Sequence, residues 1–310
     1  MSEPVTRFAI GPRDAGKRLD RLLHERIPGL SRTRIQRAIR ERVTLSWGVT
    51  ARPATPVRPG GEVHIGWTPL PETPCDVPLP VLARGRGWLA VDKPPGIPVH
   101  PAHRVRENSL IRMLRRQQGE PALRLVHRLD RDTSGVLLVA EDAATARSLS
   151  LAFEQRRVHK EYLALVAGDV AGDAGRIDLP IGRDPASRIY VRLRAGTGAE
   201  AVTDWRVERR LGGRTLLRLF PHTGRRHQLR VHLEALGHPI LGDPLYGRPD
   251  RDWLDLVAGR RDARREAGEP ARTQLHCARL VFPDPEGGTA RDVTAAPPAD
   301  LLASCSDGLM

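Results

Sequence analysis

The sequence is poor in cysteine and in long apolar stretches, and each shortage excludes a class of protein. Its three cysteines, Cys75, Cys277 and Cys305, are scattered and odd in number, so they suit neither a disulfide framework nor a zinc site. No stretch approaches the roughly 18 apolar residues that span a bilayer. The opening residues, MSEPVTRFAIGPRD, lack the apolar core of a signal peptide. We therefore expect a cytoplasmic protein with no membrane partner.

Lysine is also scarce, because the 50 basic side chains are 47 arginines and only three lysines. The net charge of +13 suggests a polyanionic partner, but the arginine skew also fits a compositional bias. The distribution of charge helps to separate these explanations. Residues 1–70 carry thirteen basic and six acidic side chains, which is over half of the excess positive charge. We therefore predict nucleic-acid contact in this region.

The same region has the pattern of two helices followed by short strands. The first helix begins at Arg18, places leucines on one face and is stopped by Pro28-Gly29; Ser31 is a natural N-cap for the second helix, RTRIQRAIRERV. The segments VTLSW and EVHIGW have the composition of strands. Outward-facing arginines on the second helix can track phosphates, although a solvated basic helix is the ordinary alternative. The predicted RNA contacts are Arg32, Arg34, Arg37 and Arg40.

Taken as a whole, the pattern RLDRLL…LSRTRIQRAIRE.RV…VRPGGEV resembles the S-four-like RNA-binding module, named after a small-subunit ribosomal protein. One departure is LSWGVTA, where that family usually has VNGK between its strands. The resemblance implies that residues 1–70 bind structured RNA. The five prolines of residues 68–80 then predict a stiff linker or an extended strap, and we place the linker at 71–80.

A dense charged loop, HRLDRDTSG at 127–135, stands directly before the apolar run VLLVA. This run, ended by Glu141-Asp142, predicts a strand that is buried on both faces. Charges at the mouth of such a strand are costly unless they are paired or used. Asp130 and Asp132 are too few to hold a metal. The loop is therefore either a structural ion-pair loop or the carrier of a carboxylate that does covalent or acid–base chemistry.

Other stretches add candidate residues without deciding their role. VDKPPGIPVH is a strand end and a proline-rich loop, which could be a structural turn or a ligand contact. A helix is predicted from about Asp142, then a strand HKEYLALVAG, and the closing LHCARLVF is a further strand. Residues 222–247, HTGRRHQLRVHLEALGHPILGDPLYG, read as a strand or helix start that lines a site, or as a basic RNA-facing edge.

These motifs, in this order and spacing, resemble the RluA-type RNA pseudouridine synthases over about residues 80–285. The departures are an arginine-rich insert at 248–272 and a short tail after 300. The resemblance implies an α+β catalytic domain, placed at 81–305, with a central, mostly antiparallel sheet.

The resemblance also implies roles for individual residues. Asp130 is expected to be the catalytic aspartate and Tyr162 the active-site tyrosine, while Arg230 is the basic partner of the aspartate. Arg128 is expected to help hold the target nucleotide out of its helix. We expect further substrate contacts from His127, Thr133, Lys93, Arg226 and His227.

Isomerising uridine to pseudouridine adds no electrons or groups, so we expect neither a cofactor nor a metal. The aspartate could stabilise the sugar cation, attack the sugar or take a proton, and the sequence does not choose among these. The expected substrate is large-subunit (23S) ribosomal RNA, with transfer RNA second, and the expected state is a monomer. The rivals are a catalytically silent RNA-binding or ribosome-assembly factor and, less favoured, a nucleoside hydrolase.

Overall fold

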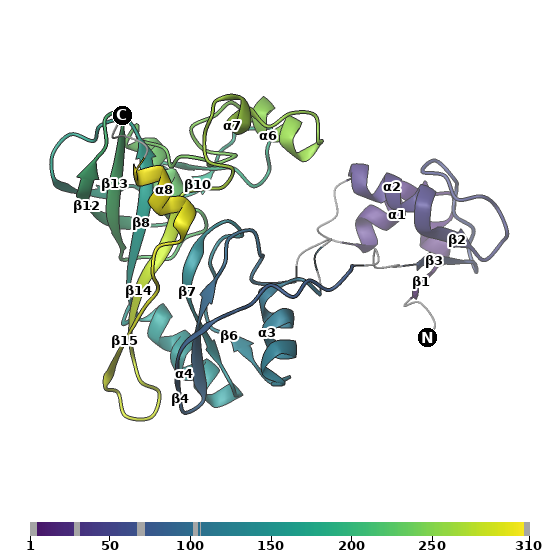
Figure 1. The fold of residues 1–310 in the computed structure, drawn as a ribbon. Helices are drawn as coiled ribbons and strands as arrows, with labels where there is room; N and C mark the ends of the chain where they lie inside the picture. Colours follow the sequence, from purple (N-terminus) through teal and green to yellow (C-terminus); the bar gives the residue numbers. More distant parts are fainter. Residues whose placement is uncertain (1–4, 28–31, 67–71, 102–104, 106, 307–310) are drawn as a thin grey trace. The chain divides into compact units, whose positions relative to one another are not determined.

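The computed structural model describes residues 5–27, 32–66, 72–101, 105 and 107–306 (Figure 1). The chain divides into two compact units, residues 1–72 and residues 73–310, which are described separately. The helix stop at Pro28-Gly29 and the N-cap at Ser31 lie outside the described residues. No helix in the described part of the chain combines the length and the apolar character that a bilayer crossing requires.

The first unit is a three-stranded antiparallel sheet, in the order β1-β3-β2, with two helices. Its elements are β1 (Val5–Ala9), η1 (Pro12–Asp14), α1 (Leu19–Arg26), α2 (Arg32–Arg42), β2 (Val43–Leu45) and β3 (Glu62–Gly66). Both predicted helices and both predicted strands are present, although the strands are shorter than their sequence patterns. Strand β1 was not predicted, because its apolar residues are few and only its pairing with β3 gives it a partner.

The helices of this unit bury the apolar faces that the sequence predicted. Leu19, Leu22 and Leu23 of α1 and Ile35 and Ile39 of α2 form one core with the strands. The predicted RNA contacts Arg32, Arg37 and Arg40 are exposed on α2, and the side chain of Arg34 lies outside the described residues.

The second unit is built on a ten-stranded mixed sheet, with strand order β4-β5-β7-β14-β8-β13-β12-β9; β15 pairs with β14 and β6 with β7. Only β7 and β14 pair in parallel among the described strands. The strands are β4 (Val81–Gly85), β5 (Trp88–Lys93), β6 (Arg124–Leu125), β7 (Ser134–Ala140), β8 (His159–Ala167), β9 (Ala174–Asp178), β12 (Val202–Arg210), β13 (Arg214–Pro221), β14 (Leu275–Pro283) and β15 (Ala290–Thr294), with a separate hairpin of β10 (Ile181–Arg183) and β11 (Leu193–Ala195). The α+β fold with a mostly antiparallel central sheet is confirmed.

Strand β7 is the inner strand that the run VLLVA predicted, and all seven of its residues are buried. It lies between β5 on one side and β14 with β6 on the other. The charged loop 127–133 therefore ends at the start of a rigid, doubly flanked strand. This arrangement fixes the loop from its carboxyl end.

The helices of this unit are α3 (Leu110–Gln118), α4 (Ala143–Glu154), α5 (Gln228–Ala235), α6 (Asp250–Val257), α7 (Ala263–Glu266) and α8 (Ala299–Ser306). Helix α4 begins where predicted, with the Asp142 carboxylate accepting the N–H of Thr145 at 2.8 Å, and it packs on β7 (Figure 1). The motif at 222–247 supplies α5 and the loop before it. Of the proline-rich segment, residues 72–80 form no helix or strand, and Leu79 is buried in the core of the second unit.

Candidate active site

A cavity of about 580 Å³ opens where four segments of the second unit meet. The segments are the charged loop before β7, the end of α4, the first half of β8, and the loop before α5 with the start of that helix. Of the nine site residues predicted for the catalytic domain, the cavity wall contains eight: His127, Arg128, Asp130, Thr133, Tyr162, Arg226, His227 and Arg230. The ninth, Lys93, is not part of this wall.

Asp130 forms an ion pair with a buried arginine that has two carboxylate partners. Nη1 of Arg230 lies 3.1 Å from Oδ2 of Asp130, while its Nε and Nη2 contact Asp243 at 2.5 and 2.8 Å. The Asp243 side chain is fully buried and also accepts the N–H groups of Leu245 and Tyr246. Arg230 is therefore fixed by Asp243, and its Nη1 donates to Asp130.

The charge of Asp130 is stabilised although the residue is largely enclosed. Its side chain is 21% exposed, and burial alone would raise the pKa of the carboxyl. Arg230, followed by His227 and Arg128, outweighs that effect, so the pKa of Asp130 lies below its ordinary value. The site therefore holds an ionised carboxylate at neutral pH.

Tyr162 forms the wall next to Asp130 and is a neutral phenol. It stands on β8 opposite Cys277 of β14. Burial raises the pKa of Tyr162 well above its ordinary range, and the Cys277 thiol and Asp130 raise it further. Burial also raises the pKa of Cys277 to about 12, so this thiol is neutral and inert. Tyr162 can stack on a base and donate a hydrogen bond, but it can accept a proton only if another group takes its own.

His127 has a structural partner inside the sheet. Its Nε2 accepts the backbone N–H of Leu138 at 2.8 Å, and its ring stacks on Phe153 with centroids 4.5 Å apart. Burial, with a smaller effect from Lys160, lowers the pKa of His127 to about 3. The ring is thus neutral and satisfies a β7 donor in the gap between β14 and β6.

Lys93 lies beneath the charged loop and has no exposed surface. Its ammonium group donates to the carbonyl oxygens of Pro94, Arg131 and Thr133 at 2.9, 2.8 and 2.8 Å. Burial lowers the pKa of Lys93 to about 7. In this structure Lys93 holds the loop that carries Asp130, and its substrate contact stays a prediction. Three convergent acceptors suit an ammonium group better than a planar guanidinium, which explains a lysine in this arginine-rich chain.

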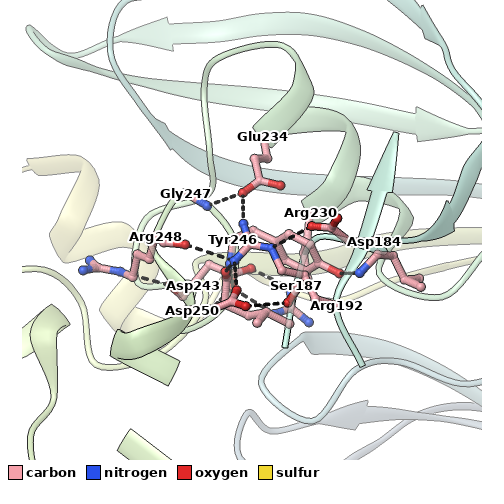
Figure 2. A network of polar contacts seen from close by, with 12 residues as sticks. Asp184, Ser187, Arg192, Arg230, Glu234, Asp243, Tyr246, Gly247, Arg248 and Asp250 are labelled. Carbon is pink, nitrogen blue, oxygen red and sulfur yellow. Dashed lines mark hydrogen bonds and ion pairs between the residues drawn. The ribbon is translucent and has the colours of Figure 1, made fainter. Parts of the chain in front are cut away.

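A second polar network supports the site from the α5 side. The ring of Tyr246 makes cation–π contacts with two guanidinium groups. Cζ of Arg230 lies 4.9 Å and Cζ of Arg192 lies 5.6 Å from the ring centroid (Figure 2). The Tyr246 hydroxyl hydrogen-bonds Nδ1 of His227 at 2.9 Å. His227 has a φ of 56°, a backbone conformation that is uncommon for a residue with a Cβ and that places its ring beside Asp130.

The rim of the cavity is basic. Arg128 is exposed, and its side chain has no hydrogen bond or ion pair to another residue within the described ranges. Arg226 is exposed and donates to the carbonyl of Val191 at 2.7 Å, while Lys160 donates to that of Thr223 at 3.0 Å. A cationic rim around a carboxylate and a buried phenol suits an anionic polymer whose reacting group enters the cavity.

Four residues of the site were not predicted from the sequence: Lys160, Asp243, Tyr246 and Cys277. Asp243 and Tyr246 stand in the quoted stretch GDPLYG, where an aspartate between apolar residues signals a buried ion pair. Cys277 has no such signal, because its contact with Tyr162 depends on the register between β14 and β8. Among the described residues, no group of three or more His, Cys, Asp and Glu side chains is placed to hold a metal ion.

Known proteins are similar to this chain in both sequence and fold. A model of the RNA pseudouridylate synthase family matches residues 87–235. The chain is 36% identical over 315 residues to ribosomal large subunit pseudouridine synthase D of Xanthomonas campestris, covering 97% of this chain and 92% of the relative. The protein of the same name from Yersinia pestis is 32% identical over 300 residues, covering 93% and 89%.

A solved structure, human RNA pseudouridylate synthase domain containing 1, matches with a TM-score of 0.60 at 31% identity, covering 76% of this chain and 90% of that one. The family model begins at residue 87, so the S-four-like resemblance of residues 1–70 stays a prediction. The resemblance drawn from the ordered motifs is confirmed over the catalytic unit. The chain belongs to the RNA pseudouridylate synthase family and is an RNA pseudouridine synthase.

Proposed function

We propose that this enzyme isomerises uridine in large-subunit (23S) ribosomal RNA and that Asp130 is its catalytic carboxylate. The observation that carries the proposal is the Asp130–Arg230–Asp243 arrangement at the base of a cavity with a basic rim. The choice of ribosomal RNA is supported by relatives named ribosomal large subunit pseudouridine synthase D, which match along nearly the whole chain.

The reaction breaks the bond from uracil N1 to ribose C1′ and joins C1′ to uracil C5. N1 gains a proton and C5 loses one, so atoms and electrons balance without a co-reactant. Positive charge develops on the sugar when the glycosidic bond breaks, and the ionised Asp130 stands where it can act on that charge. Stabilisation of the cation, attack on the sugar and removal of a sugar proton are all compatible with one carboxylate oxygen held by Arg230.

Arg230 and Tyr162 have complementary tasks in this proposal. Because Asp243 fixes two other N–H groups of Arg230, the contact with Asp130 is pre-organised and does not depend on substrate. The neutral ring of Tyr162 offers a face on which uracil stacks and a hydroxyl close to the reacting ring. Because its high pKa keeps the hydroxyl protonated, Tyr162 can relay the C5 proton only while it passes its own proton on, and it is not a standing base.

The target uridine must leave its stack to enter the cavity, at a cost on the order of a few kcal/mol. Arg128 is exposed at the rim and is free to fill the space that the base leaves. The arginines exposed on α2 are proposed to hold the RNA through its phosphates.

The decisive test is Asp130→Asn, measured with an unmodified 23S rRNA transcript and carbodiimide detection of pseudouridine. The variant keeps the shape but loses the charge, so pseudouridine formation should fall to background. RNA affinity should hold or rise slightly, because Asp130 no longer offsets the cationic rim. Arg230 keeps its Asp243 partner, so the melting temperature should stay near that of the wild type.

Asp132→Asn is the matched control, because it makes the same change in the same loop and Asp132 does not line the cavity. This variant should make pseudouridine at close to the wild-type rate. A purely structural Asp130 would instead show a loss of about 3–5 kcal/mol in the free energy of unfolding. A folded Asp130→Asn variant with near wild-type activity would refute the proposed mechanism.

A further inference from the structure

The hairpin of β10 and β11 presents an exposed aromatic ring together with exposed arginines. Tyr190 is 76% exposed, and it is the only exposed Phe, Trp or Tyr within the described residues. Cζ of Arg183 lies 5.3 Å from the centroid of its ring. Arg183, Arg188 and Arg194 are exposed, and their side chains have no hydrogen bond or ion pair to any other described residue. An aromatic face and guanidinium groups without a polar partner among the described residues are the two features that bind single-stranded nucleic acid.

These exposed side chains stand on a rigid base. Arg192 is only 12% exposed; it forms ion pairs with Glu234 at 2.7 Å and Asp250 at 3.4 Å, and it donates to the carbonyl of Leu245 at 2.7 Å (Figure 2). Asp250 also accepts the Ser187 hydroxyl at 2.7 Å. The hairpin is therefore clamped to α5 and to the start of α6, and the ring of Tyr190 projects into solvent from this fixed segment.

The hairpin also stands beside the active site. Arg226, which lines the cavity, donates to the carbonyl of Val191, the residue after Tyr190. The backbone N–H of Leu193 donates at 3.2 Å to the Tyr246 hydroxyl, which also contacts His227 of the cavity wall. The same polar network thus fixes the exposed hairpin and the groups around Asp130.

We propose that this hairpin is an RNA-docking platform, on which Tyr190 stacks with an unpaired base next to the target uridine. Arg183, Arg188 and Arg194 contact the neighbouring phosphates. The inference rests on the proposed function, because it takes the RNA strand that delivers uridine to Asp130 as the ligand. A ring on a hairpin that Arg226 of the cavity wall contacts would grip bases that flank the flipped nucleotide and so select targets with an unpaired neighbour.

The test compares Tyr190→Ala with Tyr190→Phe, which keeps the ring. Single-turnover pseudouridine formation is followed at increasing enzyme excess, on unmodified transcripts of 23S rRNA and of transfer RNA. On the RNA that the wild type modifies, Tyr190→Ala should raise the half-saturating enzyme concentration by about 5- to 150-fold, the usual value of one stacked base. Its maximal rate should stay within about twofold, and Tyr190→Phe should match the wild type.

A second comparison tests the arginines by salt dependence. Arg188→Gln should lower the log–log salt slope of binding by roughly 0.7–0.9. Arg147→Gln, an exposed arginine on α4, should leave the slope unchanged. Equal saturation curves for the alanine and wild-type enzymes, or an effect on the maximal rate alone, would overturn the proposal. If Tyr190→Ala lowers the melting temperature, the comparison of Arg188→Gln with Arg147→Gln decides whether the hairpin binds RNA. Activity on transfer RNA alone would refute the proposed substrate without touching this inference.

Discussion

At the scale of single residues, His127 shows that a residue predicted to contact the substrate can also have a structural role. It lines the cavity, but its Nε2 accepts the Leu138 N–H, so the fold requires the neutral ring. Burial lowers the pKa of His127 from its ordinary 6.5 to about 3. The unfolded chain therefore binds a proton between these values that the folded chain does not bind. The part of the unfolding free energy that depends on the neutral His127 ring is fully present above about pH 6.5. It is lost as the pH falls from there toward about 3.

His127→Gln should remove this part of the pH dependence, because a glutamine Oε1 can accept the same N–H without titrating. Between pH 7 and pH 5 the wild type should lose about 2 kcal/mol more unfolding free energy than the variant. Denaturant unfolding at the two pH values measures the difference. Equal losses in both proteins would mean that the ring is not held neutral.

The residues that could be predicted are those whose chemistry is unusual for their position. Asp130 in a charged loop before a buried strand is such a residue. The family resemblance implied its pairing with Arg230, which the structure places 3.1 Å away. For Lys93 the sequence predicted a substrate contact and not the three hydrogen bonds to carbonyl oxygens, since a sequence does not show which way a side chain points. Asp243 and Tyr246 act on the site through Arg230 and His227, and such second contacts leave no periodic signal.

At the scale of elements, the site depends on the one parallel pairing among the described strands. Gly135 of β7 has a φ of 105° and pairs with Cys277 of β14. A Cβ on Gly135 would lie 2.1 Å from the carbonyl oxygen of Cys277. A glycine is therefore required here by both the backbone conformation and the close approach of the two strands.

Gly135→Ala should lower the free energy of unfolding by about 3 kcal/mol or more, because strain at a positive φ adds to a backbone clash. Gly287→Ala is the control, since its Cβ would meet only Thr289 at 3.8 Å and its φ is not positive. Thermal unfolding of the two variants is the measurement. Equal melting temperatures would show that β7 and β14 can separate without cost.

Buried strands and capped helices were the elements that the sequence predicted best. Strand β7 and helix α4 follow from an apolar run and from an aspartate before a helical pattern. Strand β1 and the hairpin of β10 and β11 were not predicted, because short segments on a sheet edge carry little periodicity. The failure to predict the hairpin matters for the proposed RNA contact, since that hairpin carries Tyr190.

At the scale of the whole molecule, the arginines predicted to contact RNA on α2 belong to the first unit, and the residues of the candidate active site belong to the second. The first unit has its own apolar core, built from α1, α2 and the three strands. The second unit contains every residue of the cavity wall. This division predicts that the chain can lose its first unit and keep its chemistry.

Residues 73–310 alone should fold and form pseudouridine at saturating enzyme, but bind RNA more weakly and with a shallower salt dependence. If Arg32, Arg37 and Arg40 each contact one phosphate, the log–log slope should fall by roughly 2–3.

The full chain with these three arginines changed to glutamine should show most of that fall. An equal change at Arg13, Arg52 and Arg58, which are exposed on the same unit but off α2, should leave the slope close to the wild-type value. The two triple variants lose the same net charge, so a difference between them locates the RNA on α2. An unchanged slope in the truncated protein would remove the RNA-binding role from the first unit, and equal falls in both triple variants would replace a docking helix with diffuse attraction.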